Sequence, residues 1–200
     1  MSAITSQPAC IKQTDNYHTL VILDRDGVIN EDSDSYIRSL AEFIPIPSSI
    51  EAIAQLTQAG FCVTIATNQS GIGRGYYTQH VFAQISAQLK QLVEKAGGQI
   101  HHTAHCPRTP ADNCSCRKPK TGMLEDIARL VNKPLTHAIV VGDSLRDVEA
   151  GLAVGARCFL VLTGKGTQTL KNNTLDTRIT VCQNLKAVCD VLINHQQNMR

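Results

Sequence analysis

The sequence contains no tryptophan, and aromatic residues make up only 4% of its 200 residues. Proteins that bind single-stranded nucleic acid stack bases on exposed aromatic rings, so the sequence offers no such platform. The formal net charge is only +2. A charge this small provides no general attraction for the phosphate backbone of a nucleic acid or for an anionic membrane. We therefore expect neither nucleic acid nor a membrane as a partner.

Long apolar stretches are also absent. No run approaches the length that a membrane-spanning helix needs, and the segment Met1–Tyr17 lacks the apolar core of a secretory signal. We therefore predict a cytoplasmic protein, whose eight cysteines are reduced thiols or metal ligands. Apolar residues make up 42% and charged residues 18%, which is typical of a globular protein. We expect a flexible tail at residues 1–18 and a single domain at 19–200.

The most informative segment is Val21–Asn30, an apolar run that ends in Asp24, Asp26 and Gly27. It is typical of a buried strand that brings carboxylates to the edge of a sheet. Residues two apart on a strand point to the same side, and two carboxylates in one small volume repel each other unless a cation or a proton lies between them. Mg²⁺ is the cation that we expect, because it prefers oxygen ligands. Taken alone, such a pair is also a common turn sequence without any chemistry.

Predicted strands and helices alternate along the chain. This pattern predicts the α/β class, with a Rossmann-like parallel sheet and helices on both faces. Ligands bind beyond the carboxyl ends of such strands, where Asp24, Thr67 and Asp143 fall. The predicted strands are 19–24, 61–67, 99–105, 138–141, 158–162 and 178–182, and the predicted helices are 47–59, 78–96, 121–131, 145–154 and 185–195.

Four groups are expected to meet at this edge. Besides Asp24 and Asp26, the expected site contains Thr67, Lys118 and Asp143. The glycine-rich loop 68–75 would add backbone N–H groups that cradle phosphate oxygens. Carboxylates, a hard cation, a lysine and a phosphate cradle are the parts needed for phosphoryl transfer. A nucleotide kinase is excluded, because the run 163–167 lacks the order of a Walker loop.

The motifs Asp24-x-Asp26, Thr67, Lys118 and Gly142-Asp143-x-x-x-Asp147 resemble the haloacid dehalogenase (HAD) superfamily of phosphatases. The resemblance implies that Asp24 is the nucleophile and forms an aspartyl-phosphate, and that Asp26 is the general acid and base. Thr67 and Lys118 would stabilise the phosphoryl group. Mg²⁺ would be held by Asp24, Asp26 (through its backbone carbonyl) and Asp143, while Asp147 would orient the magnesium shell or Lys118. The short connections leave little room for a cap domain, so we expect a capless HAD-like fold.

Two longer runs, Thr67–Gly75 and Cys106–Pro119, resemble the heptose 1,7-bisphosphate 7-phosphatases, with histidinol-phosphatases as close relatives. The resemblance implies removal of the C7 phosphate in ADP-heptose supply for lipopolysaccharide core, by a monomer acting on a small phosphorylated sugar. Arg117 would then recognise the substrate. Other predicted substrate contacts are Asp32, Ser33, Asp34, Ser35, Asn68, Gln69, Ser70 and Lys118.

Other interpretations remain open at this stage. Histidinol phosphate is an alternative substrate, and a non-catalytic protein that binds a phosphorylated ligand is an alternative function. A phosphotransferase would use the same chemistry. The anomer at C1 of the sugar is not specified. Arg74 is interpreted either as a contact to a second phosphate or as a solvated residue, and Lys165 as a solvated loop lysine.

The cysteine-bearing loop at about 105–118 predicts a second metal. Cys106, Cys114 and Cys116 have the spacing of zinc ligands, and the zinc would hold in place the loop that carries Arg117 and Lys118. The related phosphatases have a histidine where this chain has Arg108, which cannot bind zinc because it stays protonated. His105 is the nearest candidate for a fourth ligand.

Overall fold

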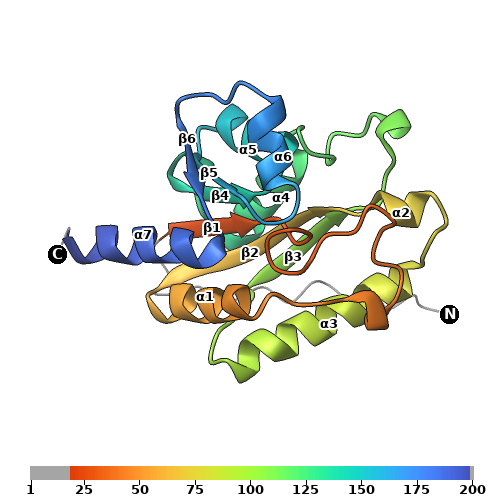
Figure 1. Cartoon of the computed structure of the whole chain (residues 1–200), viewed down its shortest axis with the longest axis horizontal. Coiled ribbons are helices and arrows are strands. Elements are labelled where there is room, and N and C mark those ends of the chain that lie inside the picture. Colours follow the sequence, from red (N-terminus) through yellow and green to blue (C-terminus); the bar gives the residue numbers. More distant parts are fainter. Residues whose placement is uncertain (1–18, 199–200) are drawn as a thin grey trace, which may run out of the picture.

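The computed structural model describes residues 19–198 and consists of one six-stranded sheet between two layers of helices (Figure 1). All strand pairs are parallel, and their order is β3-β2-β1-β4-β5-β6. The strands are β1 (Thr19–Leu23), β2 (Phe61–Asn68), β3 (His102–Cys106), β4 (Ile139–Gly142), β5 (Arg157–Val161) and β6 (Ile179–Cys182). The predicted α/β class, with a parallel sheet and helices on both faces, is confirmed.

The helices are α1 (Pro47–Gln58), α2 (Ser70–Gly73), α3 (Gln79–Lys95), α4 (Gly122–Val131), α5 (Leu145–Ala153), α6 (Gly166–Asn172) and α7 (Leu185–Asn198). Three short 3-10 turns are η1 (Leu40–Glu42), η2 (Pro110–Asp112) and η3 (Leu135–His137). Figure 1 shows α1, α3 and α7 along one side of the sheet and α4, α5 and α6 along the other.

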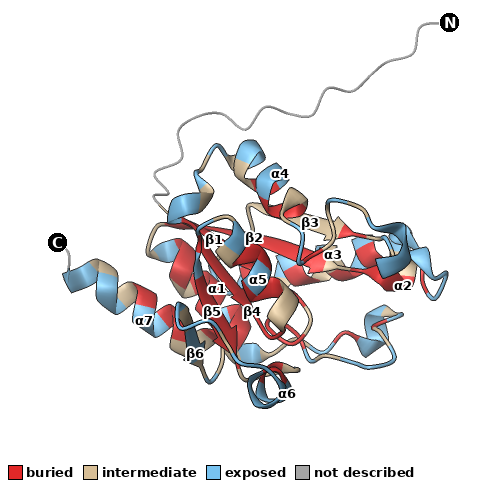
Figure 2. Cartoon of the chain, turned by 90° about the horizontal axis from the view of Figure 1, so that it is seen from above, coloured by how far each residue is buried: buried red, intermediate tan, exposed pale blue. Residues whose placement is uncertain are grey.

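The alternation of side chains along the strands divides the interior into two cores. Val21 and Leu23 of β1 face a core that also takes in apolar residues of α1, α3 and α7. Leu20 and Ile22 face the opposite core, formed with α4 and α5. Both faces of the central strands are therefore covered, and the strands are almost continuously buried (Figure 2). Such strands read as nearly unbroken apolar runs, and apart from Thr64 in the middle of β2 the polar side chains of the central strands lie at the ends.

The helix starts follow from local chemistry. Pro47 occupies the first turn of α1, where its missing N–H costs nothing. The side chain of Thr78 accepts a hydrogen bond from the backbone of Val81 and caps α3. At the start of α5, Ser144 and Asp147 form a capping box. This box holds Asp147 directly beside the end of β4.

Two features differ from the expectations. Helix α6 and the single turn α2 were not predicted, because glycines and polar residues dominate both segments.

The connections from β1 to β2 and from β2 to β3 hold only η1, α1, α2 and α3 within residues 19–198, which fits the capless prediction. None of the described helices is long and apolar enough to cross a bilayer. The predicted tail at 1–18 lies outside the described residues.

Candidate active site

Asp24 and Asp26 leave the end of β1 with different partners. The backbone N–H of Asp24 continues the sheet by donating to the carbonyl of Val141 at 2.9 Å. Its carboxylate is buried and lies 3.1 Å from the Nζ atom of Lys118. Asp26 instead accepts both donors of the Arg25 fork, at 2.9 and 3.0 Å, and a third bond from Asn30 at 3.0 Å. The sequence did not mark Arg25 as important, yet its side chain is almost completely buried.

Three buried carboxylates form an acidic cluster, defined here as Asp24, Asp143 and Asp147. One oxygen of each lies within 4.8 Å of the others. Burial raises the pKa of Asp143 to about 8, and the charges of Asp24 and Asp147 add to the rise. Burial also raises the pKa of Asp24 to about 6, against the opposing effect of Lys118. Burial and the neighbouring carboxylates therefore both oppose the ionisation of Asp24 and Asp143.

Lys118 is the cation that contacts this cluster directly. Its Nζ atom lies 2.7 Å from Asp147 Oδ1 and 3.1 Å from Asp24 Oδ1, and it donates to the carbonyl of Ala66 at 2.6 Å. Burial would lower the pKa of Lys118, but the two carboxylates outweigh it and raise that pKa. Because these partners use all three N–H groups, Lys118 supports Asp24 and is not among the residues that line the cavity.

Two glycines let the backbone close around Asp143. Gly27 has φ +80°, and a Cβ atom there would lie 2.1 Å from Asp143 Oδ2. Gly164 has φ +54°, and its Cβ atom would lie 2.3 Å from the same oxygen. The N–H of Lys165 then donates to that oxygen at 2.8 Å. Gly27 in the first motif and Gly164 after β5 are therefore both part of the site.

A cavity of about 220 Å³ opens over these carboxylates at the carboxyl ends of the strands. Its lining includes most of the predicted catalytic and substrate residues, namely Asp24, Asp26, Asp32, Ser33, Asp34, Thr67, Asn68, Gln69, Ser70, Arg117 and Asp143. Ser35, which we predicted as a substrate contact, is not among the lining residues. It is exposed in the turn in which Tyr36 N–H donates to Ser33, and its carbonyl accepts a bond from Arg38.

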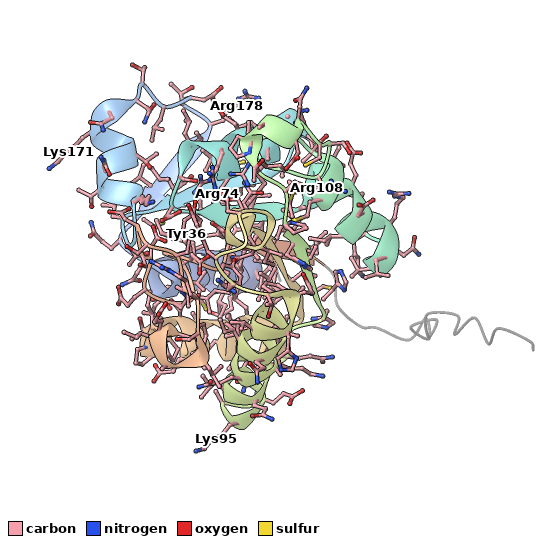
Figure 3. The ribbon with its side chains drawn as sticks, turned by 90° about the vertical axis from the view of Figure 1, so that its right-hand side faces the viewer. Tyr36, Arg74, Lys95, Arg108, Lys171 and Arg178 are labelled. Carbon is pink, nitrogen blue, oxygen red and sulfur yellow. The ribbon has the colours of Figure 1, made fainter. Side chains whose placement is uncertain are left out.

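The cavity is also lined by residues whose role the sequence analysis did not consider or did not decide. Tyr36 and Arg74 lie near the centre of the face seen in Figure 3, whereas Lys95 and Lys171 lie at its margins. Arg146 of α5 also contributes. Our interpretation of Lys165 as a solvated loop lysine was wrong, because it lines the cavity with its ammonium 3.1 Å from Asp34 and 3.4 Å from Asp32. A lysine between glycines offers no sequence signal for this placement.

The glycine-rich loop is less open than the phosphate cradle that we expected. It forms the single turn α2, and five of its backbone N–H groups already have acceptors within the protein. Two of these bonds, from Gln69 to the carbonyl of Cys106 and from Gly73 to that of Pro107, join it to the cysteine loop. A Cβ atom at Gly73 would lie 2.6 Å from that second carbonyl. The glycine therefore allows close packing between the two loops.

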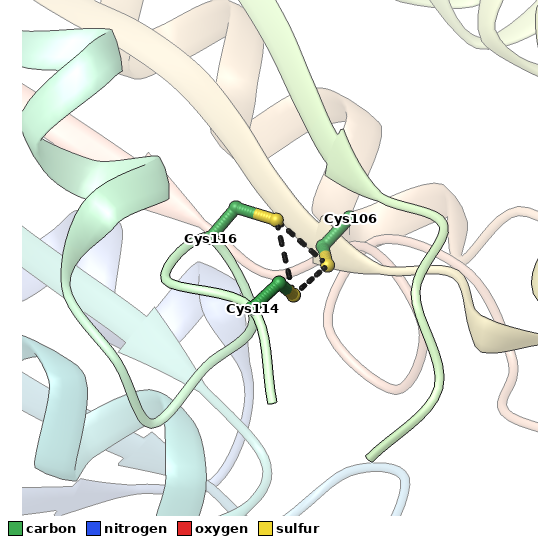
Figure 4. A group of neighbouring side chains, drawn as sticks. All are labelled: Cys106, Cys114 and Cys116. Atoms are coloured by element: carbon green, nitrogen blue, oxygen red, sulfur yellow. Dashed lines mark hydrogen bonds between the residues drawn. The ribbon is translucent and has the colours of Figure 1, made fainter. Parts of the chain in front are cut away.

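The sulfur atoms of Cys106, Cys114 and Cys116 lie 3.0 to 3.4 Å apart (Figure 4). Their proximity agrees with the predicted ligand group, and within residues 19–198 no histidine or carboxylate completes it. His105 was wrongly proposed as the fourth ligand. Neighbouring residues on a strand point to opposite faces, and the ring of His105 stacks on Phe82 and bonds to Gln79.

Comparisons with known proteins agree with this geometry. Residues 115–188 match a family model described as HAD-hydrolase-like. The D-glycero-beta-D-manno-heptose-1,7-bisphosphate 7-phosphatase of Neisseria meningitidis serogroup A is 53% identical over 154 residues, which cover 77% of this chain and 82% of that protein. The enzyme of the same name from Pseudomonas aeruginosa is 50% identical over 175 residues, covering 88% of this chain and 98% of that protein.

A crystal structure of D,D-heptose 1,7-bisphosphate phosphatase from B. bronchiseptica, complexed with magnesium and phosphate, has a TM-score of 0.86 to this chain. The two are 42% identical, and the match covers 89% of this chain and 99% of that one. Sequence identity and fold therefore agree over most of both chains. The chain belongs to the D-glycero-D-manno-heptose-1,7-bisphosphate 7-phosphatase family, within the HAD-like hydrolases.

Proposed function

We propose that this protein hydrolyses the C7 phosphate of D-glycero-β-D-manno-heptose 1,7-bisphosphate. The observation that carries the proposal is the buried carboxylate of Asp24. It contacts Lys118 and lines a cavity whose other lining residues include three arginines and Lys165. The 50–53% identical relatives that are named for this reaction support the substrate and the β anomer. Such a reaction would supply the heptose used for lipopolysaccharide core.

The acidic cluster fits a magnesium ion. Mg²⁺ prefers carboxylate oxygens. The pKa values of Asp24 and Asp143 are raised by lost solvation and by the repulsion between carboxylates, and a dication would offset both effects. We propose that Asp24, Asp143 and the backbone carbonyl of Asp26 hold it, with Asp147 orienting the group through Lys118. When bound, the ion offsets the negative charge that the phosphate brings to these carboxylates.

The reaction would proceed in two steps. A carboxylate oxygen of Asp24 attacks the phosphorus and the bond from phosphorus to O7 breaks. For its part, Asp26 must first bind a proton and release one of the four donors that it accepts from in this structure, and it then gives that proton to O7. A water molecule then attacks the aspartyl-phosphate and gives a proton to Asp26, which releases phosphate and restores Asp24. The hydroxyl of Thr67 donates to the phosphoryl oxygens, and Lys118 keeps Asp24 ionised and in place.

The positive side chains in the cavity suit the second phosphate of the substrate. Arg117 is proposed to recognise the C1 phosphate, with Arg74 as a second contact. The polar groups of Asp32, Ser33, Asp34, Asn68 and Ser70 line the same cavity and would bind the sugar hydroxyls. These groups of one chain would suffice for the binding that we propose, with a monomer as the working unit.

We also propose that Cys106, Cys114 and Cys116 hold a structural zinc ion. Three sulfur atoms that lie 3.0 to 3.4 Å apart without a disulfide suit a thiolate-binding metal. The free thiols of the described residues also fit a reducing compartment, which supports a cytoplasmic location.

The test is phosphate release, with Mg²⁺, from the α and β anomers of heptose 1,7-bisphosphate and from histidinol phosphate. We expect kcat/KM to be highest for the β anomer. The Asp24→Asn variant should lose about 10⁴-fold or more in kcat, because an amide cannot form the acyl-phosphate. Preference for histidinol phosphate would overturn the proposed substrate, and full activity of Asp24→Asn would overturn the proposed mechanism.

A further inference from the structure

Gln69 lies at the first position after β2 and is only 3% exposed. Its side-chain nitrogen donates to Asp26 Oδ2 at 2.9 Å and to Thr67 Oγ1 at 2.8 Å. Its side-chain oxygen accepts from Arg25 Nη2 at 3.2 Å and from the hydroxyl of Tyr77. Gln69 therefore joins two groups that the proposed reaction uses, the acid and base Asp26 and the phosphoryl-stabilising Thr67.

These partners determine the orientation of the amide. Arg25 has only donors to offer, so it must face the oxygen of Gln69, and the carboxylate of Asp26 has only acceptors when ionised, so it must face the nitrogen. A glutamine side chain has two donor hydrogens and two acceptor lone pairs. All four are used within the protein, so none remains for a sugar hydroxyl.

We propose that Gln69 is a positioning residue, and not a substrate-binding group as the sequence suggested. Arg25 and Asn30 also hold the carboxylate of Asp26, but the amide of Gln69 is the group that links it to the hydroxyl of Thr67 and fixes their separation. Because Gln69 donates to the oxygen of Thr67, the hydroxyl hydrogen stays free to point toward the transferring phosphoryl group. Small displacements of such groups are costly, because both proton transfer and charge stabilisation need close alignment.

The surroundings of Gln69 support this assignment. Tyr77 is buried, and its ring packs so closely on the preceding loop that a Cβ atom at Gly71 would lie 2.2 Å from it. Arg25 is anchored independently by its paired bonds to Asp26 and lies 5.7 Å from the centre of the Phe82 ring. The oxygen of Gln69 is thus held from two sides, which leaves its nitrogen directed at Asp26 and Thr67.

The test uses the dependence of the rate on the leaving group, and it rests on the proposed phosphatase function. Protonation of the leaving oxygen matters for a sugar phosphate and hardly at all for p-nitrophenyl phosphate, whose leaving group departs as a stable anion. We expect Gln69→Met to lose about 10²-fold in kcat on heptose 1,7-bisphosphate but only about tenfold on p-nitrophenyl phosphate, the latter from the misplaced Thr67. We expect KM for the bisphosphate to change by less than about threefold, because Gln69 would act on the substrate only through Asp26 and Thr67.

Two further variants complete the test. Gln79→Met makes the same replacement at an exposed glutamine outside the cavity and should leave both rates unchanged. Tyr77→Phe removes one bond to the Gln69 oxygen and should give a smaller loss with the same preference for the aryl phosphate, so the inference stays testable if Gln69→Met does not fold.

The outcomes separate this inference from the proposed function. A higher KM with unchanged kcat in Gln69→Met would show a substrate contact and overturn the positioning role. Equal losses on both phosphates in Gln69→Met and Tyr77→Phe would also overturn it, since they indicate a merely structural effect. Absence of bisphosphate turnover by the unaltered protein would overturn the proposed function, and the positioning role would then be judged by comparing p-nitrophenyl phosphate with a simple alkyl phosphate.

Discussion

The acidic cluster and the cysteine cluster each gather three side chains that could hold a metal ion, but they are built differently. Asp24 and Asp143 follow the ends of β1 and β4, Asp147 lies in the first turn of α5, and all three are buried. Of the cysteines, Cys106 ends β3 and is buried, whereas Cys114 and Cys116 come from a loop and are half-buried. The parallel sheet positions the first group, because its register places strand ends at one edge.

The two clusters are linked through the chain itself. Cys116 is followed by Arg117, which lines the cavity, and by Lys118, whose ammonium contacts Asp24 and Asp147. The three cysteines pack in or against the core on the side of α4 and α5, but between Cys106 and Cys116 the loop has only the short turn η2 as regular structure. The comparison teaches that the strand ends position Asp24 and Asp143, whereas the loop that delivers Arg117 and Lys118 would be held in place by the zinc ion that we propose. The following predictions test this difference.

The largest effect on stability is expected from Lys118→Met. The substitution leaves Asp24 and Asp147 buried without their common cation, and removal of one partner from a buried ion pair costs about 3–5 kcal/mol. Urea denaturation without metal should show this loss in the free energy of unfolding. Lys120→Met is the matched control, because Lys120 is exposed and its ammonium donates to Asn113 and not to a buried carboxylate. A loss below about 1 kcal/mol, the size of a surface pair, would mean that the cluster does not need Lys118.

A smaller effect is expected from Cys116→Ser. We expect bound zinc, measured by elemental analysis, to fall to near zero, with a decrease in melting temperature smaller than that of Lys118→Met. The reason is that the loop loosens while the sheet and its cores stay intact. The rate should fall as well, since the loop carries Arg117 and Lys118. Cys182→Ser, a half-buried cysteine of β6 outside the cluster, should keep its zinc. Unchanged zinc content in Cys116→Ser would contradict the proposed zinc site.

The smallest effect concerns pH and magnesium. The folded-state pKa values of Asp24 and Asp143, about 6 and about 8, lie above the ordinary value of 3.8. The folded protein therefore binds more protons than the unfolded chain, and the contribution of these groups to stability is complete below pH 3.8 and is lost as pH rises through 6 and 8.

Mg²⁺ should cancel this loss by replacing the protons. We expect the increase in melting temperature that Mg²⁺ produces to grow from pH 5 to pH 8, while contributions from histidines cancel in the comparison of the two metal states. Asp143→Asn should remove most of this dependence. A magnesium effect that shrinks as pH rises would contradict the assignment of the cation to the acidic cluster.

Much of the acidic cluster could be predicted from sequence, because a strand that ends in polar residues has a strong local pattern. Asp24, Thr67 and Asp143 each follow an apolar run, and the alternation of strands and helices implies that these ends meet. Helix α6, Lys165 and the exclusion of Ser35 from the cavity could not be predicted. They depend on how a glycine-rich or polar segment folds against the sheet, and such segments lack the periodicity that marks helices and strands.

The roles of Gln69 and His105 show the limit most clearly. The sequence by itself determined the α/β class, the strand ends that carry Asp24 and Asp143, and the residue types that can bind a phosphate or a metal, because these depend on local patterns and on side-chain chemistry. Only the tertiary structure decided that the side chain of Gln69 forms all four of its hydrogen bonds with protein groups and that His105 faces away from the cysteines. Both outcomes depend on which neighbours the fold brings within hydrogen-bonding distance, and Arg25 and Asp26 are remote from Gln69 in the chain, as Gln79 is from His105.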